Sequence, residues 1–264
     1  MPFAPPRSLS PSKVASFTSC PLAFRLSIID RLPEAPSVPA VKGTVVHAAL
    51  ERLFSHFGRG ERTRGVALGC LDEAMTAIGD DPEFVALGLD DAGRRAMADE
   101  AAILVGNYFE LEDPNEVSPV GIEMGLEADI GDLRLRGIID RLDRRPDGEL
   151  VVVDYKTGRA PSARYEQARL SGVHIYALLV ERVLGRFPAE VRLLHLRDPV
   201  VITATPSEQT VRGQRQRTSA VWSAIGRACE QEEFRPKPGP LCRFCSFRSM
   251  CPAFGGVPPE LVAS

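Results

Sequence analysis

An apolar strand in the middle of the chain ends in charged residues that could do chemistry. Residues 150–153 form an apolar run without alternation, which is typical of a strand buried on both faces, and Asp154-Tyr155-Lys156 follows directly. Side chains two residues apart in a strand point to the same face, so Asp154 and Lys156 should lie side by side. Burying such charges is costly unless something binds there. A hard divalent cation, which prefers oxygen ligands, fits these residue types.

The preceding strand supplies a second carboxylate. Residues 133–142 are also rich in strand-forming residues, and the turn formers at 146–148 predict that the two runs pair as a hairpin. Asp140 then lies near the end of its strand. From the hairpin alone, two interpretations stay open: a metal site, or an ion pair between Asp154 and Lys156 with Asp140 solvated. A chemical role for Lys156 is favoured because lysine is rare among the 32 basic residues of the chain. The pKa of a lysine can shift, whereas an arginine at this position would stay charged.

Three short motifs around these residues resemble the PD-(D/E)XK nuclease superfamily, and most closely its RecB-like exonuclease branch, which includes the AddB type. The motifs, in the family's order, are Gly43-Thr44-Val45-Val46-His47, Gly137-Ile138-Ile139-Asp140-Arg141 and Asp154-Tyr155-Lys156-Thr157-Gly158. The match covers nearly the whole chain. It implies an α/β fold, with a mixed central sheet flanked by helices as in the core of restriction endonucleases, in a single domain over residues 1–264.

The resemblance also implies roles for individual residues. Asp140, Asp154 and Lys156 would be catalytic, and Mg²⁺ or Mn²⁺ would be held by His47, Asp140, Asp154 and the backbone carbonyl of Tyr155. The metal would polarise the scissile phosphate and lower the pKa of a bound water, which Lys156 would orient. The implied activity is that of a Mg/Mn-dependent DNA exonuclease in repair or recombination.

Two positions near these motifs have competing interpretations. His47 lies on a helix expected over residues 41–57, where a lone histidine is more often a satisfied core residue, and only the resemblance makes it a ligand. Glu123 lies on a strand expected over residues 119–128, where related nucleases often keep an acidic residue. A glutamate on a half-exposed strand explains it equally well, so Glu123 is not counted as a ligand.

The helix expected over residues 165–184 resembles the family's DNA-contacting helix only in part. Tyr176 matches a tyrosine of that helix, but Gly172 stands where the family has glutamine, and Gln167 is out of register. Tyr176 and Arg141 are the residues expected to contact nucleic acid. The departure at Gly172 permits an alternative function, a catalytically weak or inactive nuclease-fold subunit that binds DNA within a larger complex.

Three cysteines near the C-terminus, Cys242, Cys245 and Cys251, have the spacing C-x2-C-x5-C. In a cytoplasmic chain such cysteines are ligands more readily than disulfides, and Cys20, which precedes proline as Cys251 does, is a plausible fourth. Spacing alone leaves zinc and an iron–sulfur cluster nearly even. The resemblance to the Fe–S branch favours a [4Fe–4S] cluster that joins residues 8–31 to residues 236–254. A zinc-stapled partner-binding protein without a DNA role is the remaining alternative.

The elements that must position these residues follow from hydrophobic periodicity and turn signals. Helices are expected over residues 8–31 with a break at Pro21, and over 41–57, 64–79, 91–111, 165–184 and 207–232. Strands are expected over residues 119–128, 133–142, 150–155, 190–196 and 199–204.

Composition narrows the setting of this 264-residue chain, which is 44% hydrophobic and 25% charged. No apolar run approaches the ~20 residues that span a bilayer, and the N-terminus lacks the regions of a signal peptide, so a cytoplasmic location away from membranes is expected. The formal net charge of −3 gives no global basic field, so DNA contact requires a local groove. The expected partner is DNA with a free or single-stranded end. Without a P-loop sequence in this chain, any helicase would be a separate protein.

Overall fold

Two compact units make up the chain in this computed structural model, which describes residues 3–161 and 163–259 and leaves out the side chains of residues 163–173. The terminal unit comprises Met1–Ala35, Glu127–Gly137 and Glu208–Ser264. The sheet unit comprises Pro36–Leu126 and Ile138–Ser207. The acidic residues singled out above lie in the sheet unit, and the four cysteines lie in the terminal unit. The single domain joined by a cluster stays a prediction.

The helices and strands confirm the elements expected from the sequence, with bounds that differ by a few residues. The strands are β1 (Pro119–Ile130), β2 (Leu133–Arg144), β3 (Leu150–Lys156), β4 (Glu190–His195) and β5 (Val200–Ala204). The longer helices are α1 (Pro11–Ser19), α3 (Val38–His56), α4 (Arg64–Ala77), α6 (Asp91–Leu111), α7 (Ala163–Leu184) and α8 (Glu208–Glu230). Short helices are α2 (Pro21–Phe24), a π-helical turn (Arg25–Ile29), and α5 (Pro82–Ala86), where only a break was expected.

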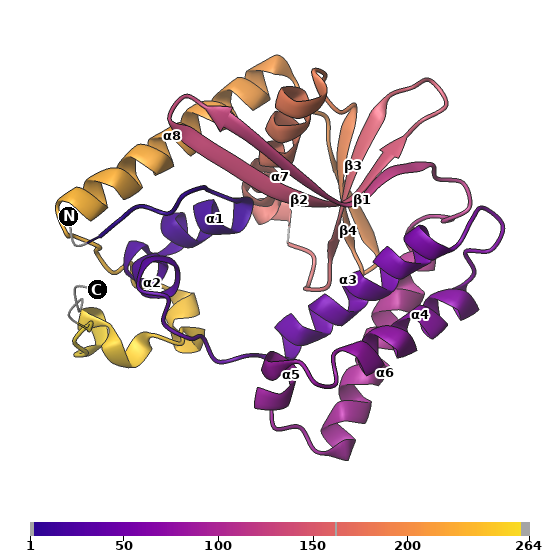
Figure 1. Ribbon diagram of the computed structural model, residues 1–264, viewed down its shortest axis with the longest axis horizontal. Helices are drawn as coiled ribbons and strands as arrows, with labels where there is room; N and C mark the ends of the chain where they lie inside the picture. The colour runs from indigo at the N-terminus through magenta and orange to yellow at the C-terminus, as the bar shows by residue number, and fades with distance from the viewer. Residues whose placement is uncertain (1–2, 162, 260–264) are drawn as a thin grey trace. The chain divides into compact units, whose positions relative to one another are not determined.

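The five strands form one mixed sheet in the order β1-β2-β3-β4-β5 (Figure 1). Strands β2 and β3 pair antiparallel, β3 and β4 pair parallel, and β4 and β5 pair antiparallel. Parallel neighbours need a crossover connection, and α7 provides the one between β3 and β4. The expected α/β fold, a mixed sheet flanked by helices, is therefore confirmed.

One face of β3 is buried under helices of the sheet unit. Val151, Val153 and Tyr155 belong to a core cluster built with α3, α4 and α6, three helices that Figure 1 shows lying together. Each fully buried aliphatic side chain contributes about 1.5–3 kcal/mol. Because strand side chains alternate, this packing directs Asp154 and Lys156 to the opposite face.

The β2–β3 turn and the start of α3 have local causes in the sequence. Gly148 adopts φ 88°, a left-handed conformation that glycine tolerates best, and the Glu149 amide donates to Asp147 Oδ1 at 3.0 Å. Helix α3 begins three residues earlier than expected, because the Ser37 hydroxyl accepts from the Ala40 amide and Pro39 fits the first turn. These features fix the ends of the elements that carry His47 and Asp154.

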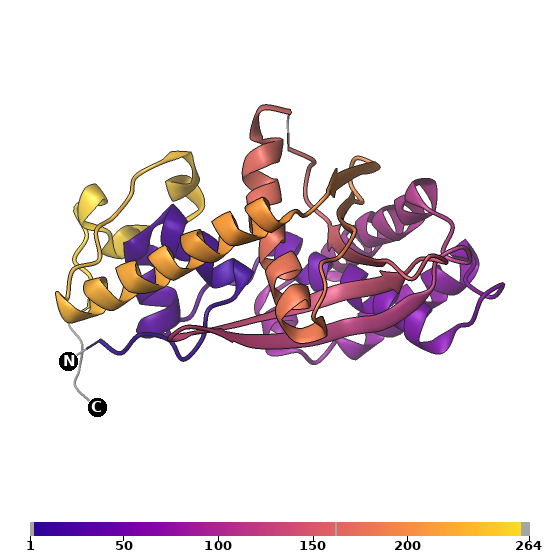
Figure 2. The same ribbon diagram turned by 90° about the horizontal axis from the view of Figure 1, so that it is seen from above.

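The terminal unit joins both ends of the chain to the tip of the β1–β2 hairpin. Leu9 pairs with Leu135: the Leu9 amide donates to the Arg134 carbonyl, and the Arg136 amide donates to the Leu9 carbonyl, both at 2.9 Å. Helix α1 packs against α8, and Figure 2 shows the two side by side. The expected break at Pro21 is present, because α1 ends at Ser19 and α2 begins at Pro21. No helix in the described parts of the chain has the length and apolar character needed to cross a membrane.

Arg141 on β2 is fully buried in the sheet unit. Its guanidinium donates to both carboxylate oxygens of Asp143 at 2.9–3.1 Å and to the Tyr155 hydroxyl at 2.9 Å. It also lies 2.5 Å from a Glu112 carboxylate oxygen and 4.5 Å from the Phe54 ring centroid. This corrects the expectation that Arg141 contacts nucleic acid, because its charge is neutralised inside the core. Arg141 instead fixes the strand on which Asp140 stands.

Replacing Arg141 with alanine should lower the free energy of unfolding by about 3–5 kcal/mol, because two carboxylates would stay buried without their cation. Arg134→Ala is the matched control on the same strand, since its ion pair with Glu127 is exposed and should be worth only about 0–1 kcal/mol. Urea unfolding followed by circular dichroism measures both values. Equal, small losses in the two variants would contradict a structural role for Arg141.

Candidate active site

Three side chains from different elements of the sheet unit bring metal-ligating atoms together. Atoms of His47 on α3, Glu123 on β1 and Asp140 on β2 all lie within 4.8 Å of one another. His47 Nδ1 is 3.5 Å from Asp140 Oδ2. The same oxygen accepts the Tyr155 amide at 2.6 Å, which fixes the Asp140 side chain at the end of β3. One imidazole nitrogen and two carboxylates therefore converge on one place.

The structure adds Glu123, which sequence reasoning weighed and did not count as a ligand. Its backbone adopts φ 44°, in the left-handed region that is unfavourable for a side-chain-bearing residue. Such a conformation costs roughly 1–3 kcal/mol and clusters at functional sites. The sequence signal was an acidic residue between two glycines, Gly121 and Gly125, but nothing in the sequence specifies the backbone turn.

Asp154 and Lys156 form an ion pair next to this cluster. The Lys156 ammonium contacts Asp154 Oδ2, which confirms that the two side chains lie on one face of β3. Asp154 is buried, whereas the Lys156 side chain is 40% exposed. Tyr176 of α7 is hydrogen-bonded to the Asp154 carboxylate. Asp154 therefore has a cation and a phenol as partners, and Lys156 is held in place with its ammonium still open to solvent.

The placement of Asp154 differs in part from the expected ligand set. The cluster of convergent atoms found in the described residues holds Asp140 and His47 together with Glu123, and Asp154 lies beside them with Lys156. Ligation by Asp154 and by the Tyr155 carbonyl stays a prediction. Positions 167 and 172, where the resemblance departs from the family, lie in the stretch of α7 whose side chains are outside the description.

Two motifs expected to form the site touch each other. A Cβ atom placed on Gly43 would lie 3.2 Å from Thr157 Oγ1, tighter than ordinary contact. The glycine of the first motif therefore lets α3 approach the end of β3 closely. A hollow of about 380 Å³ lies beside this contact and is lined by residues of α3 and β1, among them His47 and Glu123. Solvent, and with it a metal ion, has access to the cluster.

Crowded carboxylates change the protonation of the site. Burial and the neighbouring Asp140 charge raise the pKa of Glu123 to about 7. Burial, with a contribution from Asp140, likewise raises the pKa of Asp154, although Lys156 opposes the shift. Burial lowers the pKa of His47, but the Asp140 hydrogen bond and the nearby carboxylate charges outweigh it and leave the pKa above its usual value. The site has an excess of negative charge that a divalent cation would neutralise.

The donor set fits a divalent cation of the Mg²⁺ or Mn²⁺ kind. Carboxylate oxygens suit Mg²⁺ and Mn²⁺, and an imidazole nitrogen is better tolerated by Mn²⁺. His47, Glu123 and Asp140 are the residues placed to hold such an ion. The raised pKa of Glu123 is itself consistent with this, since a bound cation would favour the ionised carboxylate.

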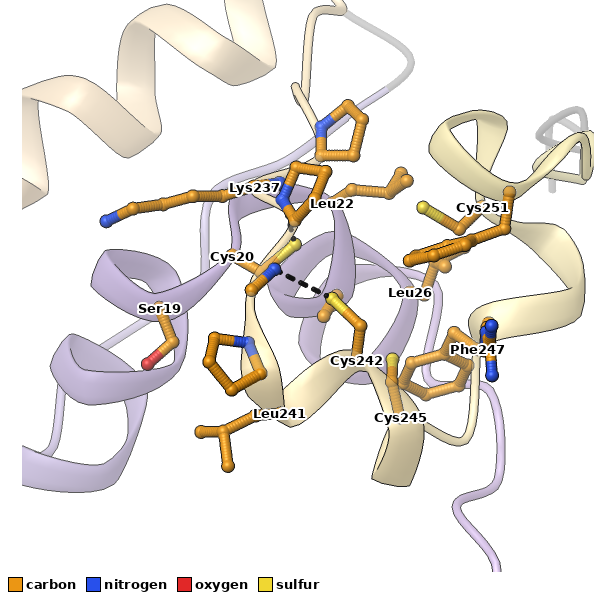
Figure 3. Close-up of a pocket in the computed structure, with 17 residues that line it drawn as sticks. Ser19, Cys20, Leu22, Leu26, Lys237, Leu241, Cys242, Cys245, Phe247 and Cys251 are labelled. Carbon is orange, nitrogen blue, oxygen red and sulfur yellow. Dashed lines mark hydrogen bonds between the residues drawn. The ribbon is translucent and has the colours of Figure 1, made fainter.

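The four cysteines expected to bind a cluster line one cavity of about 530 Å³ in the terminal unit. Figure 3 shows Cys20 arriving from the N-terminal segment and Cys242, Cys245 and Cys251 from the C-terminal segment. The Lys237 amide donates to Cys20 Sγ at 3.4 Å, and the Gly239 amide donates to Cys242 Sγ at 3.2 Å. Among the described residues, no three cysteine sulfurs lie within 4.8 Å of one another. The cysteines thus share a cavity without converging as closely as the acidic cluster does.

Comparison with known proteins places the chain in a family. The profile of the PD-(D/E)XK nuclease superfamily matches residues 8–252, a span that includes all three motifs and the acidic cluster. The chain belongs to the PD-(D/E)XK nuclease superfamily.

The chain is also similar to individual proteins. The chain is 24% identical over 289 residues to the Gene 69 protein of Mycobacterium phage L5, and 26% identical over 275 residues to that of Mycobacterium phage D29. Each alignment covers 93% of this chain and 96% of the phage protein. A crystal structure from Eubacterium rectale, of a protein described as a proposed exonuclease, has a TM-score of 0.56 over 90% of this chain and 87% of that one. At 12% identity, this last likeness concerns the fold.

Replacing Glu123 with glutamine should weaken Mn²⁺ binding and make it less dependent on pH. In the wild type, protons compete with the metal at Glu123 and His47, so affinity should fall by roughly tenfold or more from pH 8 to pH 6. Glutamine cannot ionise, so affinity at pH 8 should drop and the decline towards pH 6 should be shallower. Isothermal titration calorimetry with Mn²⁺ measures both.

Glu127→Gln is the control for this variant, because Glu127 stands on the same strand but forms an exposed ion pair with Arg134. Its Mn²⁺ affinity and pH profile should match those of the wild type. A Glu123→Gln variant that binds Mn²⁺ as the wild type does would remove Glu123 from the ligand set.

Proposed function

We propose that this chain is a Mg²⁺- or Mn²⁺-dependent DNA exonuclease that hydrolyses phosphodiester bonds. The observation that carries the proposal is the convergence of His47, Glu123 and Asp140 beside an ion pair of Asp154 with Lys156. A carboxylate–imidazole cluster that can hold a cation, next to a solvent-accessible ammonium, supplies the groups that phosphodiester hydrolysis needs.

Each residue has a distinct task in this proposal. A bound cation supplies Lewis-acid polarisation of the phosphate and a water of lowered pKa. His47, Glu123 and Asp140 would hold it, with Asp154 and the Tyr155 carbonyl as further oxygen donors. Lys156 would orient the attacking water and donate hydrogen bonds to the phosphate oxygens that gain charge.

Asp154 positions the lysine. Because Asp154 is buried and hydrogen-bonded to Tyr176, it cannot follow the Lys156 ammonium into solvent. The ammonium is therefore kept at the site even though its side chain is partly exposed. Tyr176 is expected to contact nucleic acid. In this proposal it would contact the substrate beside Asp154 and would also hold the Asp154 carboxylate in place.

Further parts of the proposal depend on the resemblance to the RecB-like, AddB-type branch. They are a preference for a free or single-stranded DNA end, a role in repair or recombination, cooperation with a separate helicase, and a cytoplasmic location. The nuclease superfamily supports a DNA substrate, and the name of the E. rectale structural neighbour agrees with exonuclease action.

Metal-dependent cleavage of end-labelled single- and double-stranded DNA tests the proposal. The wild type should cut with Mg²⁺ or Mn²⁺ and stop in EDTA, and Lys156→Ala should lose at least about a hundredfold in rate, as expected for a group that stabilises transition-state charge. Lys42→Ala is the control, because Lys42 pairs with Glu100 outside the cluster and should leave the rate unchanged.

The same experiment distinguishes an active exonuclease from an inactive DNA-binding subunit. If metal-loaded wild type binds DNA without cutting it, the chain is an inactive nuclease-fold DNA-binding subunit, the possibility that Gly172 raises. If Lys156→Ala cuts as fast as the wild type, the proposed role of the lysine is wrong. The intact set of Asp140, Asp154 and Lys156 favours the active enzyme.

For the terminal unit we propose a [4Fe–4S] cluster held by Cys20, Cys242, Cys245 and Cys251. The four cysteines line one cavity, and the resemblance to the Fe–S branch favours a cluster over zinc. The amide donors to Cys20 and Cys242 also support a cluster, because hydrogen bonds to sulfur tune such centres.

Metal analysis of anaerobically purified protein tests the cluster. The wild type should be brown and contain about four irons and four sulfides per chain, and Cys245→Ser should lose most of both. Cys70→Ser and Cys229→Ser are controls, because these thiols are buried outside the cavity and should retain the iron. A colourless protein with one zinc per chain would establish zinc instead and would favour the partner-binding alternative.

A further inference from the structure

Two phenylalanine rings stand exposed in the cysteine-bearing segment of the terminal unit. Phe244 is 72% exposed and Phe254 is 44% exposed. All twelve phenylalanines of the chain lie in its described part, and the other ten are buried or half-buried. These exposed rings lie in the segment that contains Cys242, Cys245 and Cys251. Exposed apolar surface often marks an interaction site, so the rings are candidates for binding a partner.

Each exposed ring has an arginine against it. The Arg243 guanidinium carbon lies 4.6 Å from the Phe244 ring centroid, and that of Arg248 lies 4.6 Å from the Phe254 centroid. Both arginines are exposed, and neither forms an ion pair with a carboxylate of the described residues. We call these two arginine–phenylalanine pairs the aromatic surface. Each pair presents one flat ring with a positive charge beside it, and the Arg248–Phe254 pair also lines the cavity of the four cysteines.

The segment around the aromatic surface is uniformly basic. Residues 234–259 contain Arg235, Lys237, Arg243 and Arg248 and no aspartate or glutamate. Arg235 is paired with Glu233, so the other three carry the positive charge, although the chain as a whole carries a formal net charge of −3. Short 3-10 helices, Pro240–Phe244, Arg248–Met250 and Pro252–Phe254, fix the backbone that carries the rings. The local charge is therefore opposite to that of the chain and suits an anionic partner.

We propose that the aromatic surface binds single-stranded DNA, with bases stacking on Phe244 and Phe254 and with Arg243 and Arg248 contacting backbone phosphates. Unpaired bases gain stacking on exposed rings, whereas the bases of a duplex are already stacked. Arginines beside the rings add cation–π and phosphate contacts. The inference builds on the proposed nuclease function in its choice of DNA, but it concerns the terminal unit and does not depend on cleavage.

Fluorescence anisotropy with a labelled oligothymidylate of about 20 nucleotides, in EDTA so that nothing is cut, tests the inference. Phe244→Ala with Phe254→Ala should raise the Kd for this single strand by roughly tenfold for each ring lost. Arg243→Gln with Arg248→Gln should reduce the magnitude of the slope of log K against log salt by about 1.4, the value for two phosphate contacts on a single strand. Arg→Lys at both positions should keep the slope and lose part of the affinity.

Ile103→Ala is the matched control, because Ile103 is 59% exposed on α6 of the sheet unit and should not change the Kd. Melting temperatures should be the same in all variants, since the substituted side chains are exposed, and iron content is measured in each variant because Phe254 and Arg248 also line the cavity of the four cysteines. Unchanged affinity in the double phenylalanine variant would overturn the inference, and so would an equal loss for a duplex of the same length. A change from dimer to monomer without a change in Kd would mean that the surface binds a second copy of the chain.

The outcome is separable from that of the proposed function. If the wild type never cuts DNA but the phenylalanine variants lose single-strand binding, the inference holds and the exonuclease proposal fails. If the wild type cuts DNA and the phenylalanine variants bind the single strand as well as the wild type does, the exonuclease proposal holds and the inference fails.

Discussion

Repulsion among three carboxylates is the constraint around which the sheet unit is built. Glu123 and Asp140 converge with His47, and Asp154 lies beside them near the end of β3, where the Lys156 ammonium contacts it. Burial and mutual charge raise the pKa of Glu123 to about 7, so the cluster is held together by the fold against its own electrostatics. Such an arrangement lowers the free energy of unfolding and is typical of sites that bind a cation or a phosphate.

A second group of charges, centred on Arg141, lies next to this cluster, and its guanidinium is fully paired. Arg141 is adjacent to Asp140 on β2, and its guanidinium is enclosed by the carboxylates of Asp143 and Glu112 and by the phenols of Tyr108 and Tyr155. Strand alternation then separates the two sets: Tyr155 points to the core and meets Arg141, while Asp154 and Lys156 point to the site. A buried arginine whose charge is fully paired thus stands next to a site with an excess of negative charge.

The sequence predicted what depends on local patterning and missed what depends on backbone detail. The hairpin and the placement of Asp154 and Lys156 on one face followed from strand alternation and turn residues. The contribution of Glu123 depends on a left-handed backbone conformation that no pattern encodes. Arg141 was expected at a DNA-contacting surface, and it lies instead in the core, because only the three-dimensional arrangement supplies the partners that allow an arginine to be buried.

The most direct test of the central claim is anomalous diffraction from crystals of the protein soaked in Mn²⁺. The account predicts one manganese peak at bonding distance, about 2.0–2.6 Å, from the carboxylate oxygens of Glu123 and Asp140, with the His47 imidazole completing the protein ligands. The peak should be absent from crystals of the Glu123→Gln, Asp140→Asn double variant. A manganese ion bound elsewhere in the wild type, or no ion at saturating Mn²⁺, would contradict the claim that these carboxylates form a metal site.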